Sequence, residues 1–234
     1  QGLPAPGVIG FASQSGAFGS HGLYLCLERG LGISLWCTTG NEVDVDVAEC
    51  LEYMALDAQT KVILCYIEGC RNRDRFIHAL ELARNHRKPV VMLKVGRTQL
   101  GAMAAASHTA SLVGADAVYD AVFRQYGVHR VHSIEELLDV AYACSAGIFP
   151  KSNRVGLLSS SGGVGVLMAD TATGFGLEAP ELPQDAQAKL KKLIPFSATR
   201  NPVDMTAQAT YNRMLIKDYM EVVLEQGNVD SIVC

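Results

Sequence analysis

Two short segments rich in serine and glycine have the pattern of a turn that binds an anion. They are Gln14-Ser15-Gly16 and Ser161-Gly162-Gly163, and each follows a short apolar run and opens an amphipathic stretch. A helix that begins after such a turn presents free backbone N–H groups at its positive end, where phosphate binds. Glycine lets the anion approach the backbone, and serine can cap the helix or donate to the anion. The alternative is that both segments are ordinary tight turns with an N-cap.

Neither turn matches a known nucleotide or nucleophile motif. The spacing G-x-x-x-x-G-K-[ST] and the spacing G-x-G-x-x-G are both absent from them. Ser13 and Ser159 stand where the hydrolase pattern G-x-S-x-G requires glycine. A serine hydrolase that uses Ser15 or Ser161 is therefore the weakest of the functions considered.

His108 is the candidate for covalent catalysis. It lies in a segment of small residues, 96–110, and is the only titratable side chain there after Arg97. Imidazole is nucleophilic and titrates near neutral pH, so it can attack a phosphoryl or acyl centre. A loop of small residues suits a group that moves between two sites. From the residue types alone, an ordinary surface histidine is the simpler interpretation.

Glu68 follows the apolar run 61–67, at the carboxyl end of a predicted strand. The carboxyl ends of parallel strands face the binding crevice of an α/β sheet, so this carboxylate could fix the tautomer of His108. It could equally cap the next helix or pair with Arg71 or Arg73.

The segment 40–46 begins with Gly40-Asn41 and carries three alternating carboxylates. It could line a substrate pocket, with Gly40 and Asn41 as candidate contacts. A loop that leads into a helix, with Asp44 or Asp46 as the N-cap, is the interpretation that such a run favours.

Short apolar runs alternate with helical patterns along the first 130 residues. The predicted strands cover 7–12, 33–37, 61–67, 89–95 and 128–131, and the clearest helices cover 74–85 and 114–126. Such alternation predicts βαβ units and a parallel sheet, and five strands indicate a flavodoxin-like, three-layer αβα fold. A further helix should begin at Ser133, which forms a capping-box pattern with Glu136.

An internal repeat indicates a second, related domain. Residues 10–19 align with residues 156–165, and five of the ten positions are identical. The polar, proline-containing segment 147–153 between the two copies is typical of a linker. We therefore expect two flavodoxin-like α/β domains, 1–150 and 151–234. The second ends on an apolar strand-like run, 230–234, so we expect it to be truncated.

Composition excludes several classes of protein. The chain has 234 residues, 20 Lys and Arg, 24 Asp and Glu, and a formal charge of -4. A mildly acidic chain without a basic stripe argues against nucleic acid as the main partner, and no apolar run is long enough to cross a membrane. The seven cysteines form no C-x-x-C pair. They predict reduced thiols in a cytoplasmic protein and neither a disulfide framework nor a metal site.

Several motifs together resemble the NDP-forming acyl-CoA synthetases, which are relatives of succinyl-CoA synthetase. They occur in the family's order and cover nearly the whole chain. They are Gly10-Phe11-Ala12-Ser13-Gln14-Ser15-Gly16-Ala17, Tyr66-Ile67-Glu68-Gly69, Lys88-Pro89-Val90-Val91, Ser107-His108-Thr109-Ala110, Ser160-Ser161-Gly162-Gly163-Val164-Gly165 and Asn201-Pro202-Val203-Asp204. The family commonly has glycine at the position of Ala110.

The resemblance implies the reaction acid + CoA + ATP (or GTP) ⇌ acyl-CoA + ADP (or GDP) + phosphate. It implies that His108 carries phosphate as a phosphohistidine, that Glu68 orients it, and that the two Ser/Gly helix starts bind the phosphoryl group. Coenzyme A and the nucleotide with its Mg2+ would be bound mainly by a CoA-binding domain and an ATP-grasp domain that these residues do not include. We therefore expect an oligomer that is inactive without those domains. The alternative from another class is a non-catalytic module that binds phosphate or nucleotide.

Overall fold

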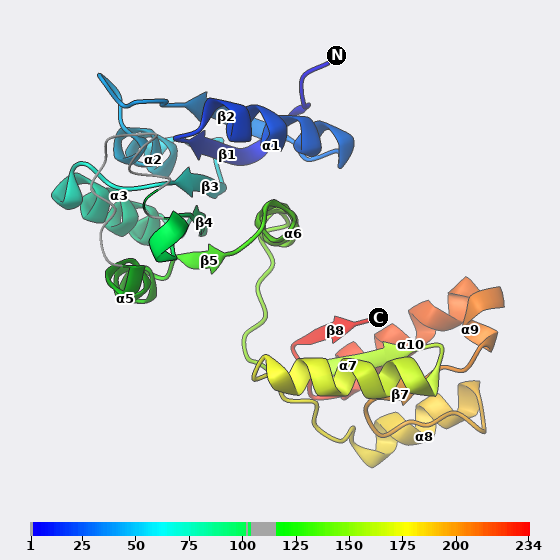
Figure 1. The fold of residues 1–234 in the computed structure, drawn as a ribbon. Coiled ribbons are helices and arrows are strands. Elements are labelled where there is room, and N and C mark those ends of the chain that lie inside the picture. The colour runs from blue at the N-terminus through cyan, green and yellow to red at the C-terminus, as the bar shows by residue number, and fades with distance from the viewer. Residues whose placement is uncertain (1, 102, 104–115) are drawn as a thin grey trace. The chain divides into compact units, whose positions relative to one another are not determined.

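The computed structural model describes residues 2–101, 103 and 116–234. The chain divides into two compact units, residues 1–148 and 149–234 (Figure 1). Each unit is a separate α/β structure with its own sheet and its own core. Within the described residues, no helix combines the length and the apolar character that a membrane crossing requires.

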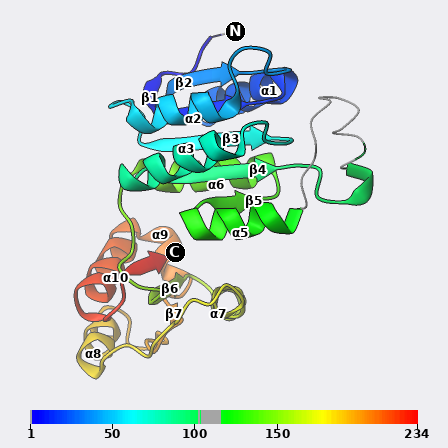
Figure 2. The same ribbon diagram turned by 90° about the vertical axis from the view of Figure 1, so that its left-hand side faces the viewer.

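A parallel sheet of five strands forms the centre of the first unit. The strands are β1 (Pro6–Ser13), β2 (Ile33–Thr38), β3 (Val62–Ile67), β4 (Val90–Lys94) and β5 (His129–Val131). Their order across the sheet is β2-β1-β3-β4-β5, and all run in the same direction (Figure 2). This confirms the predicted flavodoxin-like architecture. Ser13 pairs with Thr38 on one side and Tyr66 on the other, so three strands end at one level.

Helices cover both faces of this sheet (Figure 1). One face carries α2 (Val47–Leu56), α3 (Arg73–Asn85) and α5 (Asp116–Tyr126), and the other carries α1 (Gly16–Glu28) and α6 (Ile134–Ser145). Side chains alternate along β3, as the pleat of a strand requires. Ile63 and Cys65 pack with the first group of helices, whereas Leu64 packs with the second.

Helix α1 lies directly against β1. A Cβ placed on Gly22 would lie 2.4 Å from the Phe11 ring, so only glycine fits at this position. The Trp36 indole donates to the Gly19 carbonyl across 3.0 Å and ties α1 to β2. These contacts fix the direction in which α1 leaves the end of β1.

The second unit repeats this layered design around a smaller sheet. Strand β6 (Val155–Ser159) lies between β7 (Val203–Asp204) and β8 (Ser231–Val233), all parallel. Helix α7 (Gly162–Gly174) packs on one side of the sheet, and α8 (Gln184–Leu193) and α10 (Arg213–Gln226) form the other core with the short α9 (Gln208–Tyr211). Tyr219 is buried in that core, and its hydroxyl bonds the Leu190 carbonyl and Ser197.

One predicted cap differs in detail. The Ser133 hydroxyl accepts the Glu136 N–H across 3.1 Å, as the capping-box pattern requires. The Glu136 carboxylate, however, accepts the N–H of His132 instead of that of Ser133. The reciprocal bond is therefore displaced by one residue, because the chain bends at Ser133 from extended into helical backbone.

Candidate functional site

The start of α1 lies at the carboxyl end of β1, in the centre of the first sheet. Ser15 is its N-cap, and the hydroxyl accepts the N–H of Phe18 across 3.2 Å. Gly16 and Ala17 are exposed, and their N–H groups precede the first intrahelical bond, which runs from Gly19 to the Ser15 carbonyl. These two N–H groups therefore remain available to an anion at the positive end of the helix.

Gln14 is buried and does not reach out toward a ligand. Its Nε2 donates to the Gly69 carbonyl and to Glu42, both across 2.8 Å. Its Oε1 accepts the N–H groups of Glu68 and Gly69. The Gln14 side chain thus uses both its donors and its acceptor to fix the loop after β3 against the end of β1.

Glu42 is the buried carboxylate that the sequence did not single out. Its Oε1 accepts from Gln14, from Thr39 and from the N–H of Val47, the first residue of α2. Arg71 approaches the same residue, with Nε 3.9 Å from Oε2 and Nη1 bonded to the Glu42 carbonyl. The only earlier signal was its place in the acidic run 40–46, for which the sequence favoured a loop that leads into a helix with Asp44 or Asp46 as the N-cap.

Asp46 confirms the structural interpretation of that run. It is the N-cap of α2 and forms a full capping box with Glu49. Asn41 lines a cavity of about 450 Å³ together with Thr38, Asp44 and Val45. This volume lies within the range of small-molecule sites. Gly40 is exposed, has a positive φ of 57°, and shapes the turn that leads to Asn41.

Two thiols line the same cavity. Cys37 on β2 and Cys50 on α2 interact, and the Cys50 S–H lowers the pKa of the Cys37 thiol below its usual range. The same interaction and burial raise the pKa of Cys50. Burial raises the pKa of Cys26 to about 11 and that of Cys70 to about 12. Cys37 therefore has a lowered thiol pKa, whereas the pKa values of Cys26, Cys50 and Cys70 are raised.

Glu68 follows the last residue of β3, beside the start of α1. Its Oε2 is buried and has no hydrogen-bond partner among the described residues. Other residues take two of the alternative roles considered for this carboxylate. Asn72, not Glu68, caps α3, and Arg71 pairs with Glu42. The Oε2 atom of Glu68 therefore accepts no hydrogen bond from any described residue.

Lys94 ends β4 at the same edge of the sheet and is 1% exposed. Its Nζ donates to the Val95 carbonyl and lies 4.7 Å from the centre of the Tyr119 ring. Burial lowers the pKa of Lys94, whereas the charges of Asp116 and Glu68 act in the opposite direction. A buried cation therefore contributes to the electrostatic potential around Glu68.

The start of α7 in the second unit repeats the geometry of α1. The Ser159 hydroxyl donates to the Ser161 carbonyl across 2.9 Å, as the Ser13 hydroxyl does to the Ser15 carbonyl across 2.8 Å. Ser161 is the N-cap, but its side chain makes no capping bond. Ser161, Gly162 and Gly163 are exposed. The Ser161 N–H donates to the Ser159 hydroxyl across 3.1 Å, so the N–H groups of Gly162 and Gly163 are the ones that remain available at this second helix start.

Asp204 makes the two helix starts chemically different. A Cβ placed on Gly162 would lie 3.2 Å from Asp204 Oδ2, while Oδ1 accepts the N–H of Thr206 across 2.8 Å. This carboxylate lies beside the positive end of α7, where it competes with an incoming anion.

His108 and Ala110 lie outside the described residues. The proposed pairing of His108 with Glu68 and with the two helix starts is therefore still a prediction. In the described ranges, no group of three or more histidine, cysteine or acidic side chains is arranged to hold a metal ion.

Comparison with known protein families gives two matches. Residues 6–144 match the succinyl-CoA ligase like flavodoxin domain, and residues 155–233 match the Ligase-CoA domain.

Named relatives cover the same span. The alpha subunit of acetate–CoA ligase [ADP-forming] II of Pyrococcus furiosus is 37% identical over 231 residues, which are 97% of this chain and 49% of that protein. The 4-hydroxybutyrate–CoA ligase [ADP-forming] of Nitrosopumilus maritimus is 32% identical over 98% of this chain and 33% of its own length. The chain thus spans half or less of the length of these relatives.

A solved structure has the same fold. The dinucleotide-forming acetyl-coenzyme A synthetase 1 of Ca. Korarchaeum cryptofilum, in complex with phosphate and ADP, superposes with a TM-score of 0.83 at 29% identity. The match covers 97% of this chain and 56% of that one.

Proposed function

Since this chain belongs to the succinyl-CoA ligase-like family, with a flavodoxin-like domain followed by a ligase-CoA domain, we propose that it is the phosphate-carrying core of an NDP-forming acyl-CoA synthetase. The reaction is acid + CoA + ATP (or GTP) ⇌ acyl-CoA + ADP (or GDP) + phosphate. The relatives named as ADP-forming ligases support the ADP form of this reaction.

The observation that carries the proposal is the unpartnered, buried Oε2 of Glu68, a residue whose backbone N–H is bonded to Gln14, just before the N-cap of α1. A buried carboxylate oxygen without a donor is costly, so a site that keeps one supplies a donor from elsewhere. In our proposal this donor is an imidazole N–H of His108. The bond would hold the second ring nitrogen free to act as a nucleophile.

The phosphoryl group then moves in two transfers. The free nitrogen of His108 attacks the γ-phosphorus of the nucleotide, an N–P bond forms, and the nucleoside diphosphate leaves with the electron pair of the broken P–O bond. A carboxylate oxygen of the acid next attacks the same phosphorus, and the N–P bond breaks to give an acyl phosphate. The CoA thiolate finally attacks the acyl carbon and releases phosphate.

The helix starts stabilise the anionic group during these transfers. The N–H groups of Gly16 and Ala17 are available at the first, and those of Gly162 and Gly163 at the second. Fixed N–H donors and helix dipoles stabilise developing charge without reorganisation. Ser15 supports this as the cap of α1 and Gln14 by fixing the loop that carries Glu68.

The remaining parts of the enzyme complete the proposal. A CoA-binding domain and an ATP-grasp domain, on the same polypeptide or on a partner subunit, supply CoA and the nucleotide with its Mg2+. We place the boundary between the two domains of this chain near residue 150, and Asn41 at the pocket for the carboxylic acid. We expect an oligomeric, cytoplasmic enzyme whose core is inactive without the completing domains.

Detection of phosphohistidine tests the proposal. The chain, combined with its CoA-binding and ATP-grasp domains, is incubated with γ-labelled ATP, and acid-labile, alkali-stable label is located by mass spectrometry. We expect label on His108, none in His108→Asn, and full label in the control His129→Asn, whose histidine is exposed at the opposite end of the sheet. Equal labelling of His108→Asn would refute the role of His108. An unlabelled wild type that still binds phosphate would favour the non-catalytic binding module.

A further inference from the structure

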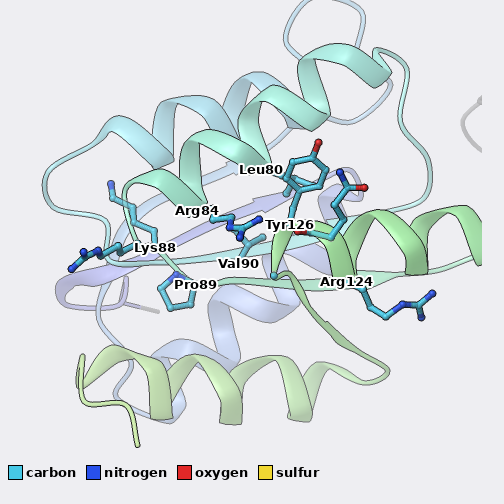
Figure 3. Close-up of a pocket in the computed structure, with 10 residues that line it drawn as sticks. Leu80, Arg84, Lys88, Pro89, Val90, Arg124 and Tyr126 are labelled. Carbon is cyan, nitrogen blue, oxygen red and sulfur yellow. Dashed lines mark hydrogen bonds between the residues drawn. The ribbon is translucent and has the colours of Figure 1, made fainter. Parts of the chain in front are cut away.

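A basic cleft lies at the end of the first sheet that is opposite to the candidate site. It has a volume of about 300 Å³ and lies where α3 and α5 end and β4 begins (Figure 3). Its cations are Arg84, Arg87, Lys88 and Arg124. Val90, the first residue of β4, lines the cleft, whereas Lys94, the last residue, lies at the candidate site. The length of the strand therefore separates the two.

The charge of this cleft is unbalanced. Four of its ten lining residues are cationic and none is acidic, although the chain as a whole carries a net charge of -4. The side chains of Arg87 and Arg124 form no hydrogen bond or ion pair with any described residue. The charge of Arg124 acts on the Asp120 carboxylate, but the main partner of Asp120 is Arg130. In the described part of the chain, these two guanidinium groups therefore stabilise no other element through a hydrogen bond or an ion pair.

The side chains of the other two cations, Arg84 and Lys88, form hydrogen bonds that fix their positions. Arg84 Nη1 donates to the Gln125 carbonyl across 3.0 Å and so bridges α3 to the end of α5. Lys88 Nζ donates to the carbonyls of Met54 and Asp57 at the end of α2. The bond of Arg84 places a cation against the negative end of α5, and the bonds of Lys88 do the same at the end of α2. One of the five N–H donors of Arg84 is used, and the rest of its planar group is preorganised.

The remaining lining is apolar and aromatic apart from Gln125. Figure 3 shows Arg84 next to Tyr126, with Lys88 and Arg124 on either side of them. Leu80, Pro89 and Val90 complete the floor of the cleft. The volume matches the lower end of small-molecule sites, and a ring with flanking cations suits a group that carries several negative charges.

We propose that this cleft binds a polyphosphate chain, either free or as part of a nucleotide, at a site separate from that of phosphate transfer. Arg84 is held in place by its bond to α5, and Arg87, just after α3, and Arg124, on α5, supply two further positive charges to the ligand. The proposal stands independently of the catalytic role of His108.

Titration of the 234-residue chain with tripolyphosphate at low salt tests the proposal. Calorimetry gives the affinity, and the amide NMR signal of Gly127 reports binding in the cleft, while that of Gly16 reports binding at α1. We expect the Gly127 signal to move, and the double variant Arg87→Gln/Arg124→Gln to weaken this binding about tenfold or more, since it removes two charge-assisted contacts. The control Lys191→Gln/Lys192→Gln makes the same change of charge on α8 and should leave the affinity unchanged.

Two further ligands identify the source of the polyphosphate. Tighter binding of ATP than of tripolyphosphate indicates a nucleotide whose base contacts Tyr126, and equal binding indicates the polyphosphate alone. Two results would overturn the proposal: a Gly127 signal that stays in place when tripolyphosphate is added, or an affinity at the cleft that is the same in wild type and in Arg87→Gln/Arg124→Gln. A shift of Gly16 alone would also reject the cleft while leaving the proposed phosphate-transfer site intact.

Discussion

The Gln14 amide and the Glu42 carboxylate lie 2.8 Å apart, Nε2 to Oε1, in the interior of the first unit. The bond joins the turn before α1 to the loop before α2, and the same amide holds the loop after β3. Three connections at the carboxyl edge of the sheet therefore share one side chain. The geometry of the helix start depends on this internal bonding as well as on Ser15.

Removal of the Gln14 amide should destabilise the first unit. Gln14→Ala leaves the N–H of Glu68 and the N–H and carbonyl of Gly69 without their partner. We expect a loss of about 2–4 kcal/mol in the free energy of unfolding, since each orphaned buried group costs about 1–3 kcal/mol. Trp36, the only tryptophan, reports unfolding of this unit by fluorescence in urea. Gln59→Ala, at an exposed position, is the control, and a Gln14→Ala chain as stable as that control would contradict the role of Gln14.

Neutralisation of Asp204 should strengthen anion binding at α7. Asp204→Asn removes the negative charge beside Gly162 and keeps an oxygen for the N–H of Thr206. A charge at a helix end is worth about 0.3–1 kcal/mol, so phosphate affinity should rise about two- to fivefold. The measurement is a phosphate titration followed by the amide signals of residues 162–165. Asp185→Asn, in the first turn of α8, should have no effect on those signals, and an unchanged or weaker affinity in Asp204→Asn would show that Asp204 does not oppose the anion.

Substitution of Gly22 should disrupt the contact between α1 and β1. The added methyl of Gly22→Ala would lie 2.4 Å from the Phe11 ring, which is itself fully buried. We expect a loss of about 1–3 kcal/mol from overpacking. Gly16→Ala in the same helix meets no atom within 4 Å and should leave stability unchanged or raise it by about 0.5–1 kcal/mol. Equal stabilities of the two variants, measured by Trp36 fluorescence, would rule out the close approach.

Lys94 should give the first unit a specific dependence on pH. Burial lowers the pKa of Lys94 in the folded state, so the folded chain releases this proton before the unfolded chain does as the pH rises. The unfolded state then binds more protons, and the contribution of Lys94 to stability increases from its lowered pKa up to the ordinary value of 10.5.

Lys94→Met removes this contribution. Its stability relative to wild type should therefore be highest at neutral pH and fall as the pH approaches 10.5. Urea unfolding at a series of pH values measures the difference, from which the titrations shared by both proteins cancel. Lys151→Met, at an exposed position, is the control for the loss of one lysine charge. A difference between Lys94→Met and wild type that does not change with pH would contradict the effect of burial.

Cys37 should be the first half-buried thiol to react with an alkylating reagent. The Cys50 S–H lowers its pKa, whereas burial raises the pKa of Cys70 and Cys144. The thiolate is the reactive form, so iodoacetamide near pH 7.5 should modify Cys37 before Cys70 and Cys144. Cys50→Ala should slow the reaction of Cys37, and Cys144→Ala should not. Mass spectrometry of the peptides gives the order, and prior modification of Cys70 would contradict it.

The fold was predictable because its signals are local. Each strand of the first sheet is a short apolar run, and the strands found begin and end within one residue of those expected, as Val62–Ile67 does within 61–67. The cap at Asp46 follows in the same way from residue type and position. Helix and strand periodicity depend on neighbours in sequence, so both can be recognised without knowledge of the tertiary structure.

The side-chain roles at the site were less predictable, because their partners are distant in sequence. Gln14 was expected to contact phosphate, yet its amide is bonded to Glu42 and to the loop at Glu68 and Gly69. Glu42 lies in a polar run and has a positive φ of 52°. Nothing in such a run indicates a buried carboxylate that accepts several hydrogen bonds. The approach of Asp204 to Gly162 depends on the parallel pairing of β7 with β6. Periodicity does not contain such information.

The hydroxyl-to-carbonyl bond that Ser13 makes to Ser15, and Ser159 makes to Ser161, limits how the two copies of the repeat can diverge. The bond requires the hydroxyl of Ser13 or Ser159, so a change at either donor alters the path into the helix, whereas the accepting carbonyl belongs to the backbone. The residue between them carries no such restriction, and there the copies differ: a buried Gln14 in one and an exposed Ser160 in the other. The two copies of the turn therefore differ at this position: Gln14 bonds the loops at Glu42 and Glu68 in the first unit, whereas Ser160 lies exposed at the surface of the second.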